Sequence, residues 1–346
     1  MSEELSERQK FILTLVIHEY IRTAQPIGSQ HLVEHYHLDM SPATVRNELA
    51  ALTEMGYLRQ PHTSAGREPT EDGYRYFVRQ LMGHTDLPAP TKQTITHQFY
   101  QAGADVDHWM RLAASVLAHQ SQAASLVTAP HPEHSIFKHL ELIGTRGRQV
   151  LMVLVLSGGE VSQQMLSLAE PVSQEQLSAV AQTINQICLG LDSDGIAALM
   201  TPATALEQDI LKLVAGEMRR SGDVITGELY RDGLTHVLSE PEFGELEVAR
   251  RALRVLEERP FLENLLARTV LSTERGGVQV LIGGEGTWEE LRECSMVLAR
   301  YGAPGLATGT LGVLGPMRMA YGRTISTVRF VAGLLSDLVE DVLAEE

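Results

Sequence analysis

The chain has 346 residues, of which 44% are hydrophobic and 21% charged, a length and composition typical of two or three globular domains. Its 28 Lys and Arg against 44 Asp and Glu give a net charge of −16, which excludes a general polyanion-binding protein and leaves only a local patch for nucleic acid. The two cysteines are far apart, which argues against a disulfide framework, and the polar N-terminal segment argues against a signal peptide. The sequence has no apolar run of about 18 residues, the length a membrane span needs. Together these features favour a cytoplasmic protein.

Two helices are predicted at the start of the chain. The spacing of apolar residues indicates the first over residues 5–23 and the second over about 29–36. Ser6, with a glutamine three positions later, has the form of a capping box. Ser29 follows a break that contains proline and glycine, and it is predicted to cap the second helix.

A third helix is predicted between Ser41 and Gly56. A serine followed by proline is typical of a helix start, and a glycine just past the last turn is typical of its end. Val45, Leu49 and Leu52 recur at helical spacing and form its inward stripe.

The face opposite that stripe is predicted to contact DNA. Arg46 and Asn47 lie there, and these side chain types are best suited to guanine and adenine edges in the major groove. Thr44 lies at the flank of the same face. Ser41 stands at the helix N-terminus, where backbone N–H groups favour a phosphate.

Two short strands, "YLRQ" and "REPT", are predicted around the turn "PHTSAG", with a further helix over about residues 70–81. Three helices followed by a two-stranded ribbon are the pattern of a winged helix-turn-helix. The segment from Met55 to Arg67 contains no Asp or Glu, so this wing is predicted to contact the DNA backbone or minor groove. Its candidate contact residues are Arg59, His62, Thr63, Ser64 and Arg67.

A winged helix can instead bind another protein, with Arg46 and Asn47 as part of an ordinary solvated face. Residues 1–82 carry eight Lys and Arg against eleven Asp and Glu, a net charge of −3, which is unusual for a DNA-binding domain. Two such domains in a dimer would compensate, because the contribution of phosphate contacts adds over two half-sites.

The composition changes after the first domain. "GHTDLPAPTKQT", residues 83–94, is rich in proline and small polar residues and is interpreted as a linker. Beyond it the patterns predict a helix (105–123), three strands (136–143, 149–156 and 161–168) and two helices (174–190 and 204–219). These are followed by a weak hairpin (225–238), a helix (242–257), a strand (277–283), a glycine-rich strand region (301–316) and a final helix (322–344).

Two histidines and two glycine-rich stretches are interpreted as structural features and not as binding sites. His31 and His35 have a spacing that can hold a metal, but the sequence offers no further ligand except Glu34, so a solvated histidine face is favoured. "GGEGTW" at 283–288 lacks the third glycine of a dinucleotide fingerprint, and the glycines of 302–315 favour close strand packing. No nucleophile and base stand at an informative spacing, so no catalytic residue, metal or cofactor is predicted.

Four stretches carry a resemblance to a known family. They are "LSERQKFIL", "PIGSQHL", "SPATVRNELAALTEMGYLRQPHTSAGREPTEDGYRYFV" and "GTLGVLGPMRMAYGRTISTV". Together they resemble the heat-inducible transcription repressor family, HrcA, from residue 5 nearly to the end of the chain. The sequence departs from the family at Glu68, where an aliphatic residue is usual, and at "LIGGEG", where "YIGEEN" is commoner.

The resemblance implies an α+β multidomain protein, with an N-terminal winged helix-turn-helix followed by a GAF-like α/β domain that carries an inserted dimerisation domain. It also implies a homodimer that binds an inverted repeat in double-stranded operator DNA, represses chaperone operons and is kept active by a chaperonin. The expected division is 1–82 for the winged helix-turn-helix, 83–104 for the linker, 105–191 for the first GAF-like part, 192–258 for the insertion and 259–346 for the second GAF-like part.

Two other functions stay open at this stage. The chain could be a winged-helix regulator controlled by a small ligand in its GAF-like domain, although a fold does not establish a ligand. It could also be an enzyme with an accessory winged helix, but the sequence offers no catalytic constellation. We therefore expect a repressor that is not an enzyme.

Overall fold

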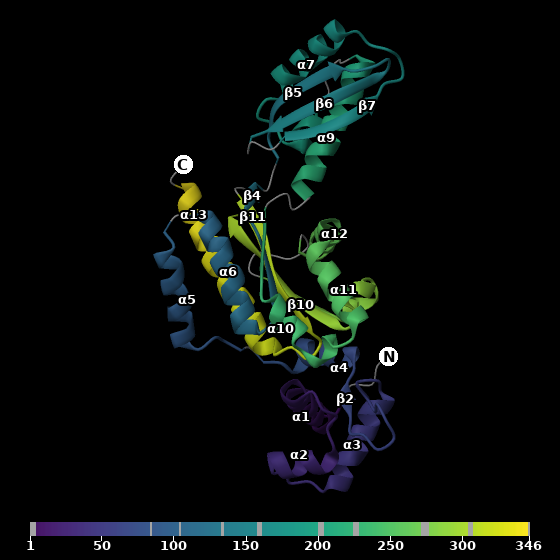
Figure 1. Cartoon of the computed structure of the whole chain (residues 1–346), viewed down its shortest axis with the longest axis vertical. Helices are drawn as coiled ribbons and strands as arrows, with labels where there is room; N and C mark the ends of the chain where they lie inside the picture. Colours follow the sequence, from purple (N-terminus) through teal and green to yellow (C-terminus); the bar gives the residue numbers. More distant parts are fainter. Residues whose placement is uncertain are drawn as a thin grey trace.

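The computed structural model describes residues 5–83, 85–103, 105–132, 135–157, 161–199, 204–223, 228–270, 277–303 and 307–344. Helices and strands are mixed, and they form three successive units along the long axis of the molecule (Figure 1). We call them the head (residues 5–83), the body (residues 85–132 and 228–344) and the inserted unit (residues 135–223). A six-stranded sheet forms the centre of the body, and a three-stranded sheet forms the inserted unit.

The head consists of three helices, a two-stranded ribbon and a final helical segment. Its elements are α1 (Glu7–Thr23), α2 (Ser29–Tyr36), α3 (Pro42–Glu54), β1 (Leu58–Arg59), β2 (Glu68–Pro69), α4 (Glu71–Tyr76) and a π-helical turn, η1 (Phe77–Leu81). The two strands are antiparallel, with Arg59 opposite Glu68. The predicted order of elements is confirmed in this part of the chain.

Two of the three predicted helix caps are confirmed. Ser6 forms the reciprocal capping box at the start of α1. The Ser41 hydroxyl accepts the backbone N–H of Thr44 at the start of α3, at 3.1 Å. The prediction for Ser29 is wrong, because α2 begins one residue earlier with Gly28 as its cap, and Ser29 is buried in the first turn.

The sheet of the body has the strand order β8-β3-β11-β10-β9, with β4 paired to β11, and its pairs are antiparallel. Its strands are β3 (Ala124–Thr128), β4 (His131–Pro132), β8 (Leu229–Asp232), β9 (Val278–Ile282), β10 (Cys294–Ala303) and β11 (Ala307–Pro316). The helices are α5 (Ala89–Gln101), α6 (Val106–Ser121), α10 (Leu234–Leu238), α11 (Leu246–Glu257), α12 (Arg259–Val270) and α13 (Tyr321–Ala344), with short turns η2 (Pro241–Phe243), η3 (Gly283–Gly286) and η4 (Glu289–Leu291).

Helices cover both faces of this sheet, so its central strands β10 and β11 are buried along almost their whole length. In β10, Val297 and Tyr301 pack on the side of α6 and α13, whereas Leu298 packs on the side of α11 and α12. A Cβ atom on Gly309 would lie 2.5 Å from the Tyr301 ring, and one on Gly312 would lie 2.5 Å from the Leu298 side chain. The close strand packing predicted for the glycine-rich segment is thus confirmed at these two positions.

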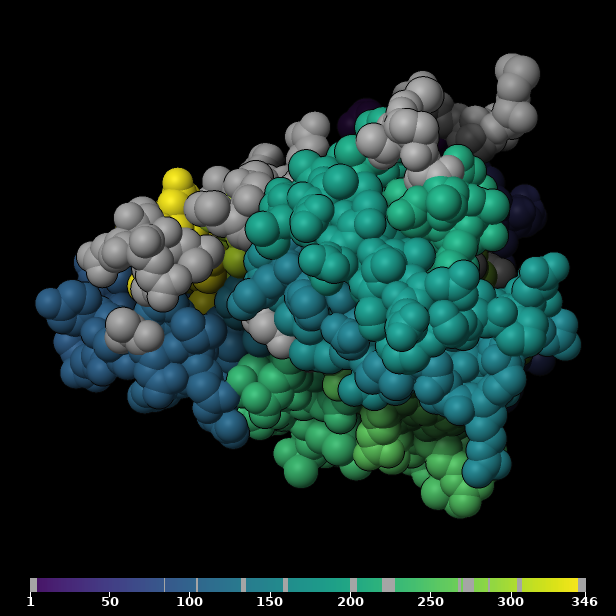
Figure 2. Space-filling model, turned by 90° about the horizontal axis from the view of Figure 1, so that it is seen from above, coloured from purple at the N-terminus to yellow at the C-terminus, as the bar shows by residue number. Residues whose placement is uncertain are grey.

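The inserted unit has its own hydrophobic core. Its elements are β5 (Phe137–Gly144), β6 (Gln149–Leu156), β7 (Val161–Ser167), α7 (Gln174–Cys188), α8 (Ser193–Ala197) and α9 (Ala205–Asp223), with the strand order β5-β6-β7. Its buried side chains form one cluster that extends from Phe137 to Met218. Figure 2 shows the molecule from the end that carries the inserted unit, and the teal residues of this unit cover much of the view.

The expected division of the chain at residues 191 and 192 is therefore wrong. Ile184 and Leu211, which lie on either side of it, belong to the same cluster. The insertion interrupts the body between β3 and β8, which pair with each other in the body sheet. Residues 228–258, expected in the insertion, belong to the body, and the strands over 137–167 form a sheet separate from that of β9 to β11.

Two shorter predictions also need correction. The linker expected at 83–104 contains α5, whose Ile95 and Phe99 lie four residues apart and are buried in the body. Pro90 suggested a linker, but proline is well tolerated in the first turn of a helix. In the hairpin expected at 225–238, β8 is a strand but the second half is the helix α10, and residues 225–227 lie outside the described residues. None of the helices within the described ranges is both long enough and apolar enough to cross a membrane.

Candidate nucleic-acid interface

Helix α3 presents the predicted contact face to solvent. Val45 and Leu52 are fully buried, and they fix the orientation of the helix on α1 and α2. Arg46 and Asn47 are exposed on the opposite face, and Thr44 is half-buried at its flank. The structure therefore brings together the two side chains that were predicted to contact base edges.

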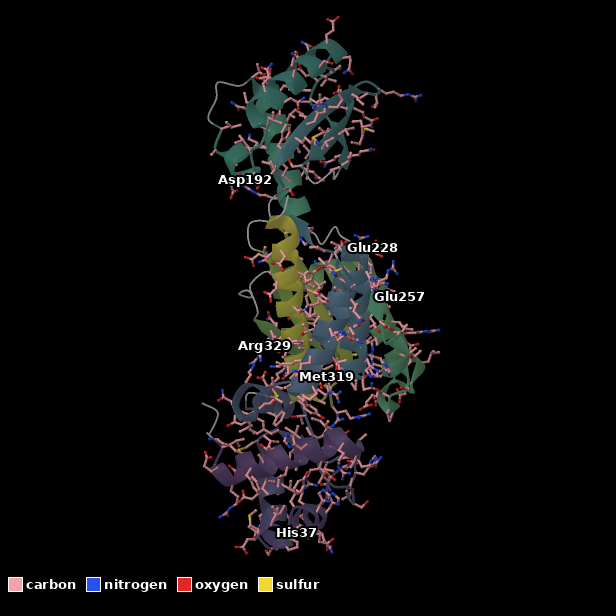
Figure 3. All side chains as sticks on the ribbon, turned by 90° about the vertical axis from the view of Figure 1, so that its left-hand side faces the viewer. His37, Asp192, Glu228, Glu257, Met319 and Arg329 are labelled. Carbon is pink, nitrogen blue, oxygen red and sulfur yellow. The ribbon has the colours of Figure 1, made fainter. Side chains whose placement is uncertain are left out.

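The N-terminal end of α3 lies far from the body. Figure 3 shows His37, in the turn before α3, at the opposite end of the head from Met319, which lies where the head meets the body. The hydroxyl of Ser41 is occupied as the cap of the helix and lies 2.9 Å from the Thr44 hydroxyl. Any phosphate contact at Ser41 therefore uses the exposed helix end, where the helix dipole favours an anion.

The ribbon forms a short wing with a polar tip. His62, Thr63 and Ser64 are exposed there. The Gln60 side chain amide braces the turn by donating to the carbonyls of Thr63 and Ala65, at 3.0 and 2.9 Å. The tip therefore offers two hydroxyls and an imidazole to a neighbouring surface.

The two arginines of the wing are tied back to the head. Arg59 donates through Nε to Glu68 at 2.6 Å, and Glu68 is 7% exposed. Arg67 donates through Nε to the Thr53 hydroxyl of α3 at 3.0 Å. Glu68, the residue that departs from the family pattern, thus neutralises part of the positive charge predicted for the wing. The partner of Arg67 in that contact is a neutral hydroxyl, so the contact does not offset the positive charge of Arg67.

The sequence did not reveal a buried carboxylate that joins α1 to α2. Glu19 is 1% exposed and accepts hydrogen bonds from Arg22 at 2.5 Å and from the Tyr36 hydroxyl at 3.2 Å. Its Oε1 lies 2.7 Å from Nε2 of His31, and Nε2 of His35 lies 3.9 Å from its Oε2. The two histidines, predicted as a solvated face, are half-exposed and stack on each other over this carboxylate.

The hydrogen bond from Arg22 is the main reason why the pKa of Glu19 falls from the usual 4.5 to about 2, although burial opposes the change. A carboxyl whose folded pKa is lowered stabilises the fold above pH 4.5 and loses that contribution as the pH falls toward 2. Since α2 supports α3, the ionised Glu19 helps to hold the contact face in position.

Replacing Glu19 by glutamine is expected to lower the free energy of unfolding at neutral pH by about 1–3 kcal/mol, because a charged hydrogen-bond acceptor is lost in a buried place. The difference from the unaltered chain should shrink as the pH falls from 4.5 toward 2. Urea unfolding at several pH values measures both effects. Glu34→Gln, an exposed carboxyl on α2, is the control. Equal losses in the two variants, or a loss independent of pH, would contradict this role for Glu19.

Comparisons with known proteins decide the family. The family model described as "HrcA protein C terminal domain" matches residues 107–325. A "Heat-inducible transcription repressor HrcA" from Roseiflexus castenholzii is 44% identical over 354 residues, which cover 100% of this chain and 98% of the relative. The corresponding repressor from Herpetosiphon aurantiacus is 43% identical over 352 residues, with the same two shares. The chain belongs to the heat-inducible transcription repressor family, HrcA.

These matches confirm the predicted family, and with it a function in the negative regulation of heat-shock transcription. Transcription repression is not an enzymatic activity. A solved structure described as a hypothetical protein matches this chain with a TM-score of 0.56 and 22% identity. The match covers 97% of this chain and 98% of the chain in that structure. That similarity supports the mixed helix and sheet fold over the full length.

Proposed function

We propose that the head is a winged helix-turn-helix that binds operator DNA. The single observation that carries the proposal is the exposed pair Arg46 and Asn47 on the capped helix α3, in a chain of a repressor family. These two residues contact base edges in the major groove. The residues that contact phosphates or the minor groove are Ser41, Thr44, Arg59, His62, Thr63, Ser64 and Arg67.

The charge of the head supports a homodimer on an inverted repeat. With a net charge of −3, one head attracts DNA weakly. When two heads are joined, binding of the second becomes intramolecular, which can raise the affinity by roughly 10²–10⁴-fold. A two-fold symmetric pair of heads matches a two-fold symmetric operator. The dimer bound to that operator blocks transcription.

The inserted unit supplies the dimer interface in this proposal. Helices α7 and α9 cover one face of its sheet. The other face carries an apolar row across the three strands, Ile143, Leu151 and Met165, in register. Ile143 and Met165 are 42% and 54% exposed, and Val161 near the end of the same face is 52% exposed. A second copy of the same face would bury these side chains, as expected of a self-complementary interface.

The body corresponds to a GAF-like domain interrupted by the inserted dimerisation unit. Heat inactivates the repressor in the cytoplasm by loosening the body, and a chaperonin restores it by refolding. The body depends on long-range strand pairs such as β3 with β11 and β8, and such pairs form slowly during folding. We therefore assign the effect of chaperonin to the fraction of active chains and not to their intrinsic affinity.

The experiment that tests this function titrates the full chain with a duplex that carries an inverted repeat, before and after heating, with and without chaperonin. Stoichiometric titration gives the active fraction, and dilution gives the dissociation constant. We expect heating to lower the active fraction and chaperonin to raise it, at a constant dissociation constant. A fixed active fraction with a tighter dissociation constant would mean that chaperonin acts as an allosteric partner instead.

A ligand-controlled regulator is the second candidate. A groove of about 440 Å³ lies between α5 and α6, and Thr94, Gln98 and His119 are among its lining residues. Its lining contains no Lys, Arg, Asp or Glu, so a small neutral molecule would suit it better than an ion. A metabolite that raises the melting temperature and also changes operator affinity would favour this candidate over inactivation by heat alone.

A further inference from the structure

Two arginines donate to backbone carbonyls across the boundary between head and body, in opposite directions, and a third, the largely exposed Arg79 of η1, pairs with Glu285 of the body at 3.5 Å. Arg75 of α4 donates through Nη2 to the backbone carbonyl of Ile282 at the end of β9, at 2.8 Å. Arg318, just before α13, donates through Nη1 to the backbone carbonyl of Ile21 in the last turn of α1, at 3.4 Å. Both acceptors belong to the main chain of regular elements, so each contact ties one rigid element to the other part of the molecule.

The Arg75 contact is built tightly. Glu71 and Asp72 accept from its guanidinium at 2.8 and 2.9 Å and orient it. Gly283, directly after β9, has φ +63°, and a Cβ atom there would lie 2.3 Å from the carboxyl carbon of Glu71. Glu285 of the same turn lies 3.9 Å from Nε of Arg75. Helix α4 therefore lies directly on this turn of the body, with no room for a side chain between them.

The Arg318 contact is held from the body side. Arg318 is paired with Glu240 and with Glu242, the latter at 2.5 Å, and its side chain is 13% exposed. At the same boundary, the ring of Tyr74 from the head lies 5.9 Å from the ring of Tyr321 of the body. The planar guanidinium, fixed by carboxylates, gives each contact a defined direction as well as a distance.

The orientation of the head matters because the chain joins it to the body at one place, through residues 82–88. Leu87 is buried there, and the carbonyl of Thr85 accepts from the Ser326 hydroxyl at 2.5 Å. A single connection of this kind does not by itself fix the rotation of the head about its backbone bonds, so contacts between the head and the body must do so. The contacts of Arg75 and Arg318 join the head to two different elements of the body, and they oppose that rotation.

We propose that Arg75 and Arg318 are positioning residues that set the distance and rotation between the two α3 helices of a dimer, and so select the spacing of the operator half-sites. This inference rests on the proposed function. One added base pair rotates a half-site by about 34°, since B-DNA has roughly 10.5 base pairs per turn. A head held at two arginine contacts cannot follow that rotation, whereas a head free to rotate about its connection can.

The test measures the affinity of the full chain for inverted repeats whose half-sites are separated by different numbers of base pairs. The variants are Arg75→Ala with Arg318→Ala, and separately Gly283→Ala, which pushes Glu71 away and opens the first contact without removing a charge. Arg254→Ala is the matched control, because Arg254 pairs with Glu258 at 2.9 Å within the body. Affinity for a single half-site and the melting temperature are measured for each.

We expect the unaltered chain and Arg254→Ala to lose about 10²-fold in affinity when half a helical turn is inserted, because only one head can then bind. The double variant and Gly283→Ala should lose less than about tenfold, with unchanged affinity for a single half-site. If the double variant does not fold, Gly283→Ala and the single variants Arg75→Ala and Arg318→Ala decide the question together, because a head held at one contact can still turn about it.

A folded variant that keeps the sharp spacing optimum of the unaltered chain would overturn the inference and leave the proposed function intact. So would an unaltered chain that binds inverted repeats without any preference for spacing. An unaltered chain that binds no inverted repeat would overturn the proposed function, and this inference with it.

Discussion

Alanine at Arg46 or Asn47 is expected to weaken operator binding strongly without unfolding the head. Both side chains are exposed on α3, opposite the buried stripe that holds the helix in place. Each contact with a base edge contributes about 1–3 kcal/mol, and a dimer loses it in both half-sites. The predicted loss is therefore roughly 30-fold to 10⁴-fold in affinity, measured by fluorescence anisotropy with operator DNA.

Arg46→Lys separates base contact from charge, because lysine keeps the positive charge but lacks the fork that binds guanine in two places. If Arg46 contacts a base, Arg46→Lys should lose most of what Arg46→Ala loses and should discriminate poorly at one base position. Full retention of affinity by the lysine variant would assign Arg46 to a phosphate. Normal affinity in Arg46→Ala and Asn47→Ala alike would remove α3 from the DNA interface.

A charge placed on the open face of the inserted unit is expected to separate the dimer. Leu151 lies on the central strand β6, between Ile143 and Met165 in register. Leu151→Glu puts a carboxylate into the middle of this apolar row, where a dimer would bury it without a partner. The chain should sediment as a monomer, and operator affinity should fall by about 10²–10⁴-fold through the loss of the second head.

Ala179→Glu adds the same charge to the exposed side of α7, away from this sheet face, and serves as the control. It should remain a dimer with normal operator affinity. Binding of a single half-site should be the same in both variants, since neither changes the head. A dimeric Leu151→Glu chain would place the interface elsewhere, for example on the body.

Local signals were sufficient to predict the head. The serine caps of α1 and α3 and the stripe of Val45, Leu49 and Leu52 act within one helix, so they can be read from neighbouring positions. The face that carries Arg46 and Asn47 follows from the same periodicity. The orientation of α3 needed no information from distant parts of the chain.

The boundary of the insertion depends on contacts that local patterns do not show. The strands of β5 to β7 were predicted correctly, but the same alternation suits a strand in either sheet. Strand β3 lies directly before the insertion, yet it pairs with β8 and β11, more than a hundred residues further along. The helix α5 was missed because its prolines and small polar residues resemble a linker, although Ile95 and Phe99 have helical spacing.

The site residues divide in a similar way. Residue type suggested Arg59 as a DNA contact, but it could not show that the pairing of β1 with β2 places Arg59 opposite Glu68. Glu19 left a signal that could have been used, since it continues the stripe of Ile12 and Val16 at the next helical position. A carboxylate on an apolar stripe predicts a buried polar partner.

The central claim is that two heads, held by the rest of the chain, bind an inverted repeat and release it on heating. Footprinting of the full chain on genomic DNA, at two salt concentrations and before and after a heat step, tests it most directly. The account predicts protected segments made of two inverted half-sites at one fixed spacing, near chaperone genes, that weaken steeply with salt and disappear after heating. Protection of single or unrelated sequences, or protection that survives heat inactivation unchanged, would contradict it.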